Sequence, residues 1–197
     1  STIFAAIDAG FTSVMYDGSR LPLSENIANT QKVVSYAHAR GVSVEGELGC
    51  MNAEDGGEPA VNEGETVYTD VCQARQYAAE TEIDSLAVAV GNAHGLYKGT
   101  PNLNMQRIQE IQQAVGIPLV LHGCSGIPAA QIRQAITLGV SKINVNTELA
   151  LAGSKKIAEL LQGAQNVRLE KLMLGAQESM TSTMKSFFKL TEGTASV

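Results

Sequence analysis

The sequence lacks the features of an exported, membrane-bound or nucleic-acid-binding protein. Its first residues, STIFAAIDAG, contain no basic segment followed by a cleavage site, and no apolar run approaches the roughly 20 residues that span a bilayer. The 14 Lys and Arg residues are outnumbered by 20 Asp and Glu residues, and they are scattered rather than gathered into a stripe. We therefore expect no nucleic-acid partner, no membrane contact and a cytoplasmic location.

Cysteine is also scarce, which argues against a disulfide framework. The three cysteines, Cys50, Cys72 and Cys124, are widely spaced and include no CxxC pair. In a chain of this size they are expected to be reduced thiols. Cys124 follows His122 by two residues and could ligate a metal, although a small residue packed in a turn explains it equally well.

What the sequence does contain is an alternation of short apolar runs and amphipathic segments. The apolar runs predict five strands, at residues 11–16, 42–48, 85–90, 117–121 and 140–145. A helical pattern follows each strand, which predicts right-handed βαβ units and a parallel sheet. The length suits one sizeable core, so we expect residues 1–197 to form a single domain. A complete (β/α)8 barrel needs eight such units and roughly 250 residues.

Several residues are expected to mark the starts of the helices. Ser24, Asn104 and Thr147 are candidate N-caps, either Thr69 or Asp70 caps another helix, and Pro128 begins the helix after the fourth strand.

Three of the predicted strands lead into polar motifs. The segments SLAVAVGNAHGLY and IPLVLHGCSGIP carry His94 and His122, and VSKINVNT carries Asn144. Because the carboxyl ends of parallel strands meet at one edge of a sheet, the two histidines should lie within reach of one metal ion. Two imidazoles suit zinc, which usually takes three protein ligands in a catalytic site. The third ligand is either missing or a carboxylate such as Glu47. A lone histidine at a strand end is, however, commonly just hydrogen-bonded, and His38 should be a surface or helix-packing residue.

Two acidic features accompany the second strand. Glu45 and Glu47 lie two residues apart and therefore face the same side of the sheet, where a pair of carboxylates needs a partner. The long glycine-rich and acidic segment 49–65 that follows is either a surface linker or an active-site loop.

Small and basic residues near the strand ends suggest an anion site. Gly95, Gly123 and Ser125 let backbone amides approach a ligand closely, and Thr147 opens a helix whose N-terminus attracts phosphate. Lys98 could supply a point charge. These pieces together predict a phosphorylated ligand bound beside a metal.

With these residues identified, the chain resembles the class II, zinc-dependent fructose-bisphosphate aldolases, a family that includes the tagatose-bisphosphate enzymes. The resemblance implies a (β/α)8 barrel in which the five strands correspond to the last five. It covers about three quarters of the chain and is carried by VMYDGS at 14–19, VEGELG at 44–49, ED at 54–55, SLAVAVGNAHGLYKG at 85–99, PLVLHGCSGIP at 118–128 and GVSKINVNTEL at 139–149.

The resemblance also implies a role for each site residue. His94 and His122 match two zinc histidines, Asn144 matches the asparagine that holds the dihydroxyacetone phosphate skeleton, and Glu54 is similar to the loop glutamate that shuttles the proton. Asn146 is counted with the phosphate contacts, although many fructose enzymes have aspartate there. The remaining residues match a cradle for phosphate and a monovalent cation, Na⁺ or K⁺: Gly95, Lys98, Gly123, Ser125 and Thr147.

The implied activity is the reversible aldol cleavage of fructose 1,6-bisphosphate to dihydroxyacetone phosphate and glyceraldehyde 3-phosphate. In this family zinc polarises the ketose carbonyl, so no Schiff-base lysine is required. The family is commonly dimeric or tetrameric, so we expect a homo-oligomer. The alternatives are a tagatose-bisphosphate aldolase or a non-catalytic phosphate-binding or assembly subunit, and the segment CSGIP favours fructose.

Three departures from the family pattern qualify this expectation. The motif that carries the first metal histidine and the catalytic aspartate, expected just before the opening helix, is absent from the sequence. The loop CMNAEDGG lacks the paired glycines ahead of its acidic residues, and no arginine follows Arg168. We therefore expect the 197-residue polypeptide alone to bind zinc weakly and to have negligible aldolase activity.

Overall fold

The computed structural model describes residues 2–49, 68–95, 97, 99–162 and 166–192. Its strands form one parallel sheet in the order β1-β2-β3-β4-β5, so each strand pairs with the next one along the chain. The strands are β1 (Ser13–Tyr16), β2 (Ser43–Leu48), β3 (Ser85–Val88), β4 (Leu119–Leu121) and β5 (Val140–Ile143). The helices are α1 (Thr2–Asp8), α2 (Leu23–His38), α3 (Val71–Thr81), α4 (Met105–Val115), α5 (Ala129–Thr137), α6 (Thr147–Leu161) and α7 (Leu169–Thr191).

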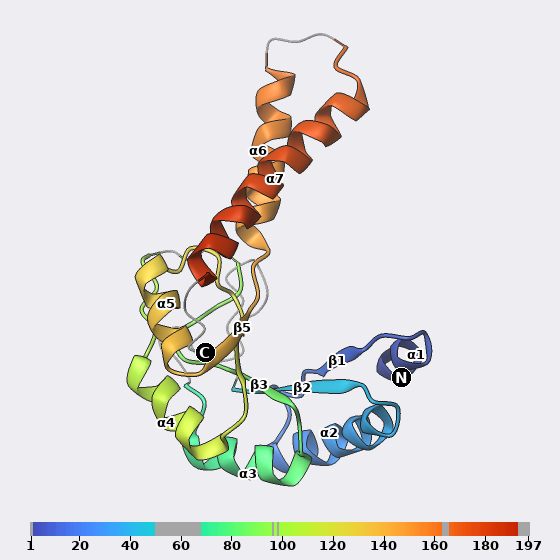
Figure 1. Cartoon of the computed structure of the whole chain (residues 1–197), viewed down its shortest axis with the longest axis vertical. Coiled ribbons are helices and arrows are strands. Elements are labelled where there is room, and N and C mark those ends of the chain that lie inside the picture. Colours follow the sequence, from blue (N-terminus) through green and yellow to red (C-terminus); the bar gives the residue numbers. More distant parts are fainter. Residues whose placement is uncertain (1, 50–67, 96, 98, 163–165, 193–197) are drawn as a thin grey trace.

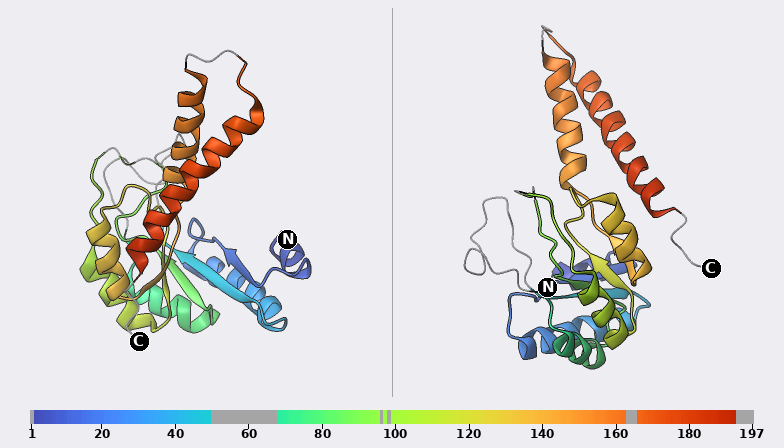
Figure 2. Two further views of the ribbon diagram at one scale, coloured as in Figure 1. Left: turned by 45° about the horizontal axis from the view of Figure 1, so that its top comes forward. Right: turned by 90° about the vertical axis from the view of Figure 1, so that its left-hand side faces the viewer.

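The helices that connect the strands lie along one side of the sheet. Figure 1 shows α2, α3, α4 and α5 as an arc around the strands, and the second view in Figure 2 shows the same layering. Strand order, parallel pairing and the outer helical layer match part of a (β/α)8 barrel wall, which confirms the predicted fold class.

The core forms between the outer face of the sheet and these helices. Leu86 and Leu119 are paired across β3 and β4 and are fully buried, as are Ile108 and Ile111 of α4 and Ile132 of α5. Burying one such side chain contributes roughly 1.5–3 kcal/mol, so this layer holds the strand ends in fixed positions.

Side-chain caps were predicted correctly for two helices and wrongly for two others. The carboxylate of Asp70 and the amide oxygen of Asn104 each accept a backbone hydrogen bond in the first turn of α3 and α4. Helix α2 instead begins one residue before Ser24, directly after Pro22, and α6 begins at Thr147 itself. Proline has φ fixed near the helical value and no amide hydrogen, so it can start a helix without a polar cap.

Strand β5 contains an irregularity that changes which face its side chains occupy. Val140 pairs with Leu119, but the next pair is Val120 with Lys142, so Ser141 is an extra residue. An inserted residue reverses the alternation of faces that a regular strand would keep. Val140 therefore lies on the helix-covered face and Lys142 on the opposite, inner face.

Helices α6 and α7 form an antiparallel hairpin that projects away from the sheet in all views (Figures 1 and 2). Gly153 and Gly175 are buried where the two helices touch. A side chain at Gly153 would meet Met180 and one at Gly175 would meet Leu160, so glycine allows the helices to pack closely. Seven of the exposed large apolar side chains found among the described residues lie on this hairpin: Leu151, Leu161, Leu169, Met173, Leu174, Met180 and Phe188.

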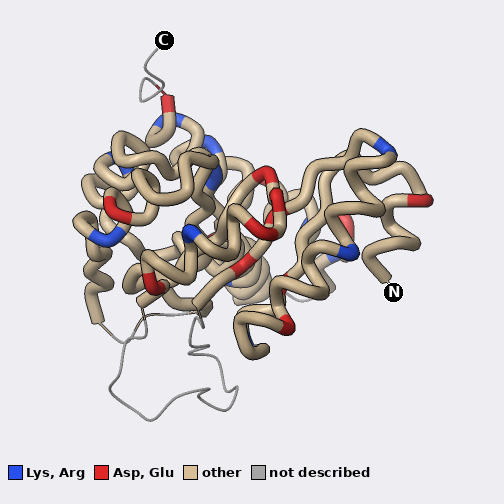
Figure 3. Tube along the Cα trace, turned by 90° about the horizontal axis from the view of Figure 1, so that it is seen from below, with Lys and Arg blue, Asp and Glu red and all other residues tan. Residues whose placement is uncertain are grey.

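The charges are mixed over the described surface. Figure 3 shows Lys and Arg interspersed among Asp and Glu rather than gathered in one place, in agreement with the scattered basic residues of the sequence. Within the described part of the chain, no helix combines the length and the apolar content needed to cross a bilayer.

Candidate active site

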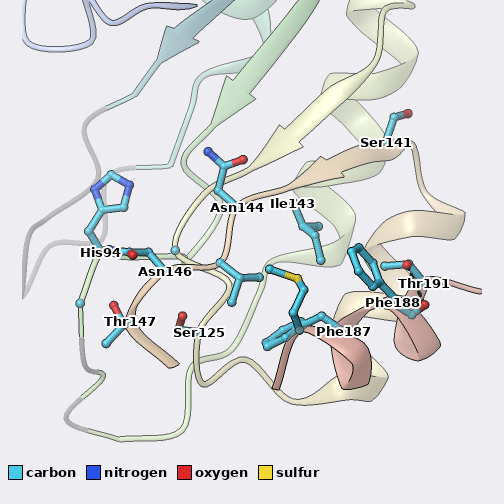
Figure 4. A pocket seen from close by; sticks show the side chains of 14 residues that line it. His94, Ser125, Ser141, Ile143, Asn144, Asn146, Thr147, Phe187, Phe188 and Thr191 are labelled. Carbon is cyan, nitrogen blue, oxygen red and sulfur yellow. Dashed lines mark hydrogen bonds between the residues drawn. The ribbon is translucent and has the colours of Figure 1, made fainter. Parts of the chain in front are cut away.

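A cavity of about 930 Å³ lies beside the carboxyl ends of the last strands. One end is polar and collects residues that follow three different strands, whereas the other end lies against α7 (Figure 4). The polar end contains His94, Gly95, Gly123, Ser125, Asn144, Asn146 and Thr147, and the apolar end contains Ile143, Val145, Met184, Phe187 and Phe188. Seven of the predicted site residues thus line one cavity.

His122 lies just beyond β4, beside the two glutamates of β2. Its Nε2 atom is 2.8 Å from Oε1 of Glu45, and its Nδ1 atom is 3.6 Å from Oε2 of Glu47. All three side chains are buried. The prediction that the two carboxylates share a face and need a partner is therefore confirmed. Their partners are His122 and Lys142, whose Nζ atom lies 2.7 Å from Oε2 of Glu45.

His94 lies on the same side of the sheet, but it does not follow its strand as immediately as expected. Strand β3 ends at Val88, so His94 follows it only after a turn. The strand ends early because its next two backbone amides bond to side chains instead of to the neighbouring strand. The Val90 amide donates to Asn92 Oδ1 at 2.8 Å and the Ala89 amide to Thr69 Oγ1 at 2.9 Å. The His94 and His122 rings nevertheless lie 5.8 Å apart between centroids.

The two glutamates have opposite electrostatic environments. Burial alone would raise the pKa of Glu45, but the hydrogen bonds from His122 and Lys142 outweigh it and lower the pKa below the ordinary value. Burial, reinforced by the charge of Asp17, raises the pKa of Glu47 to about 7. Glu45 is therefore ionised at neutral pH, while Glu47 changes between its protonated and ionised forms near neutral pH.

The imidazole of His94 favours its neutral form. Burial lowers its pKa and the neighbouring His122 lowers it further, while Asp17 acts in the opposite direction. A neutral imidazole has a free lone pair, which is the form that binds metal ions. Asp17, which follows β1, influences both His94 and Glu47 and was not predicted as part of the site.

The predicted metal ligands form a partial set. Among the described residues, no three His, Cys, Asp or Glu side chains are grouped closely enough to hold a metal ion. The pair His122 Nδ1 and Glu47 Oε2 does fit: two ligands at about 2.0–2.2 Å from a tetrahedral zinc lie about 3.3–3.6 Å from each other, and these atoms are 3.6 Å apart. That distance is too long for a hydrogen bond, so the two atoms face each other without one.

Cys124 and His38 do not join this set. The Cys124 thiol is buried, donates to the Leu121 carbonyl at 3.1 Å, and has its pKa raised to about 12 by burial. Of the two interpretations given for Cys124, the structure thus supports a small residue packed in a turn. His38 ends α2 and contacts Asp84 Oδ2 at 2.9 Å, which agrees with a helix-packing role. Cys50, Glu54 and Lys98 lie outside the described residues.

A tyrosine that the sequence did not single out holds the loops after β3 and β4 together. The Tyr97 hydroxyl accepts a hydrogen bond from the Ala93 amide at 2.8 Å and donates one to the Gly123 carbonyl at 2.9 Å. Gly123 has φ +63°, and a side chain there would collide with the Ala93 carbonyl. Only glycine fits both the backbone conformation and the space.

The start of α6 is fastened to the loop after β4 by two reciprocal hydrogen bonds, which we call the α6 clasp. The Glu148 amide donates to Ser125 Oγ at 3.1 Å, and the Gly126 amide donates to Glu148 Oε1 at 2.7 Å. The helix N-terminus was expected to offer free amides to an anion, but the Glu148 amide is already engaged. Ser125 and Thr147 remain at the cavity wall.

These features define an α/β-barrel protein with a small-molecule site at the carboxyl ends of its strands. The sequence model of the family "Fructose-bisphosphate aldolase class-II" matches residues 1–195. The chain belongs to this family, which implies a metal cofactor.

Named relatives and a solved structure agree with this assignment. The chain is 50% identical over 171 residues to a fructose-bisphosphate aldolase from Geobacillus stearothermophilus, covering 87% of this chain and 58% of that protein. It is 45% identical over 185 residues to one from Staphylococcus aureus (strain Mu50 / ATCC 700699), covering 93% and 64%. The YdjI aldolase from Escherichia coli K12 superposes with a TM-score of 0.82 at 35% identity, covering 98% of this chain and 66% of that one. The chain thus spans less than two thirds of the length of the Geobacillus stearothermophilus and Staphylococcus aureus proteins.

Proposed function

We propose that this chain carries the metal- and phosphate-binding part of a zinc-dependent aldolase that cleaves fructose 1,6-bisphosphate to dihydroxyacetone phosphate and glyceraldehyde 3-phosphate. The observation that supports this most strongly is the gathering of imidazole, amide, hydroxyl and glycine groups from three strand ends around one cavity. Relatives named fructose-bisphosphate aldolase add to it. A cytoplasmic location goes with this proposal.

The ligands proposed for zinc are His94, His122 and Glu47. Bound zinc would supply Lewis acidity at the ketose carbonyl and at the enediolate that forms from it. Within the chain, the Asn144 amide would orient the carbon skeleton of the substrate by hydrogen bonding. Glu54 would move the proton of the ketose half.

The phosphate is assigned to the polar rim of the same cavity. Backbone amides near Gly95 and Gly123 can approach an anion because neither residue carries a side chain. The Ser125, Asn146 and Thr147 side chains, which line the same cavity, add polar contacts. Lys98, and a Na⁺ or K⁺ ion, would complete the charge balance.

The function is tested by measuring metal content and aldol cleavage in the full natural protein. We expect stoichiometric zinc, cleavage of fructose 1,6-bisphosphate, loss of activity on dialysis against EDTA, and recovery on adding Zn²⁺. The 197-residue polypeptide assayed alongside should bind zinc weakly and show less than about 1% of that activity, since it would hold zinc with two histidines where the family uses three.

The same assay separates the alternatives. Selective cleavage of tagatose 1,6-bisphosphate would replace the proposed substrate, and zinc binding without cleavage of either sugar would indicate a non-catalytic phosphate-binding or assembly subunit. Sequencing upstream of Ser1 gives an independent check, because an Asp-His pair there would match the third zinc histidine and the catalytic aspartate of the family.

The natural protein is further proposed to be a homo-oligomer that associates through the α6–α7 hairpin. The hairpin presents a group of exposed apolar residues, including Leu169, Met173 and Leu174, beside charges of both signs such as Lys171 and Glu170. Mixed charges on one surface are complementary to a second copy of that surface.

Replacing two of these apolar residues should separate the copies. We expect the double variant M173K/L174K to weaken self-association roughly 100-fold, because buried apolar anchors carry most of the affinity of an interface. Sedimentation velocity over a concentration series measures this shift. Gln177→Lys, which adds one charge to the same helix at an exposed polar position, is the control. Unchanged association of the double variant would exclude the hairpin as the interface.

A further inference from the structure

A chain of charged contacts crosses the inner face of the sheet. Lys142 on β5 reaches Glu45 on β2 with its Nζ atom 2.7 Å from Oε2, and the other carboxylate oxygen lies 2.8 Å from Nε2 of His122. Strands β3 and β4 separate β2 from β5, so this contact spans two intervening strands. The residues at the same level of the intervening strands are Ala87 and Val120, whose side chains are shorter than that of Lys142.

The extra residue in β5 is what brings Lys142 to this face. Leu119 and its partner Val140 point toward the helices, where both are buried. In a regular strand Lys142 would share that face with Val140, because side chains two residues apart point the same way. The bulge at Ser141 instead pairs Lys142 with Val120, and Lys142 thereby reaches the interior. Bulges are common next to active sites, where they redirect side chains.

The contacts of Glu45 determine which nitrogen of His122 carries hydrogen. An ionised carboxylate only accepts hydrogen bonds, so Nε2 must donate to Glu45 Oε1. In the neutral ring the lone pair then resides on Nδ1, the atom that faces Glu47. A carboxylate behind a metal-binding histidine fixes its tautomer and orientation in this way, and loss of such a partner typically costs 10–100-fold in metal affinity.

We propose that Lys142 is a positioning residue for the metal site, acting through Glu45 to hold the His122 ring with Nδ1 directed at Glu47. The lysine fixes one carboxylate oxygen, which leaves the other aimed at Nε2. Although half of the lysine side chain is exposed, at 51%, the carboxylate it holds is 7% exposed, so water cannot readily replace the contact. This inference rests on the proposed function only in taking His122 as a zinc ligand.

The test compares Lys142→Met with Lys142→Arg in the full natural protein. Methionine keeps the stem but not the charge, whereas arginine keeps a donor for the carboxylate. With Zn²⁺ as the probe in a chelator competition, we expect Lys142→Met to weaken binding 10–100-fold and Lys142→Arg to restore it to within about 3-fold of wild type. Lys155→Met, an exposed lysine on α6, is the control for loss of a surface charge.

A second measurement does not require metal. In the metal-free protein at pH 8, ¹⁵N NMR of the His122 ring should show the Nε2–H tautomer in wild type and Lys142→Arg, and a mixture of tautomers in Lys142→Met. Wild-type zinc affinity or an unchanged tautomer in Lys142→Met would overturn the proposal. Failure of the aldolase assay with the lysine effect intact would instead contradict the proposed function alone.

Discussion

Replacing His122 with alanine is expected to lower kcat/KM for fructose 1,6-bisphosphate at least about 1000-fold in the full natural protein. Polarisation of a carbonyl by a metal ion is worth several kcal/mol, and each 1.4 kcal/mol corresponds to a factor of ten in rate. The substitution also removes one of the two ion-pair partners that Glu45 has among the described residues, and Lys142 is the other. Zinc content measured on the same sample should fall together with the activity.

His38→Ala is the matched control for this prediction. His38 is also hydrogen-bonded to a carboxylate, that of Asp84, but it lies at the end of α2 and away from the cavity. Its removal should leave kcat/KM within about 3-fold of wild type, because partly exposed polar contacts of this kind contribute little. If His122→Ala kept more than a tenth of the activity at saturating zinc, His122 would not be a ligand of the catalytic metal.

Gly123→Ala should destabilise the protein by about 2–5 kcal/mol. The left-handed backbone at φ +63° costs an alanine about 1–2 kcal/mol. The added methyl group also meets the Ala93 carbonyl, which is backbone and cannot rotate away, and such overpacking costs about 1–3 kcal/mol. Urea denaturation measures the loss. Relief of the collision would displace the Tyr97 contact, so the KM for substrate should rise as well.

Gly116→Ala separates backbone strain from collision. Gly116 ends α4 with nearly the same conformation, φ +66°, but a methyl group there would have no atom within 4 Å. This variant should lose only the strain energy of about 1–2 kcal/mol. Equal destabilisation of the two variants would show that the Ala93 carbonyl moves aside and that Gly123 is required for its conformation alone.

The parts of the fold that follow from local patterns were predictable. Apolar runs located all five strands, and the order of strands and helices fixed a parallel sheet. The spacing of Glu45 and Glu47 correctly placed both on one face, and the strand ends correctly placed His122 near His94. These inferences depend on the period of a strand and on the common edge of parallel strands, which hold without knowledge of distant contacts.

The parts that depend on contacts between distant residues were not predictable. The bulge at Ser141 has no glycine or proline to mark it, so simple alternation from Val140 would place Lys142 on the wrong face. Tyr97 gains its role only because the loops after β3 and β4 meet. The early end of β3 likewise arises from the Thr69 and Asn92 side chains, whose positions are set by tertiary folding.

The α6 clasp has a mechanical consequence. Helix α6 contains 15 residues, so its far end lies about 22 Å from the two hydrogen bonds at its base. A rotation of about 5° at the base would therefore move the tip by roughly 2 Å over that helix length. Conversely, holding the tip still restricts the base to small angles, and the Ser125 hydroxyl and Gly126 amide are restrained with it. A contact that restrains the tip of the hairpin therefore also restrains the loop after β4 at the polar end of the cavity.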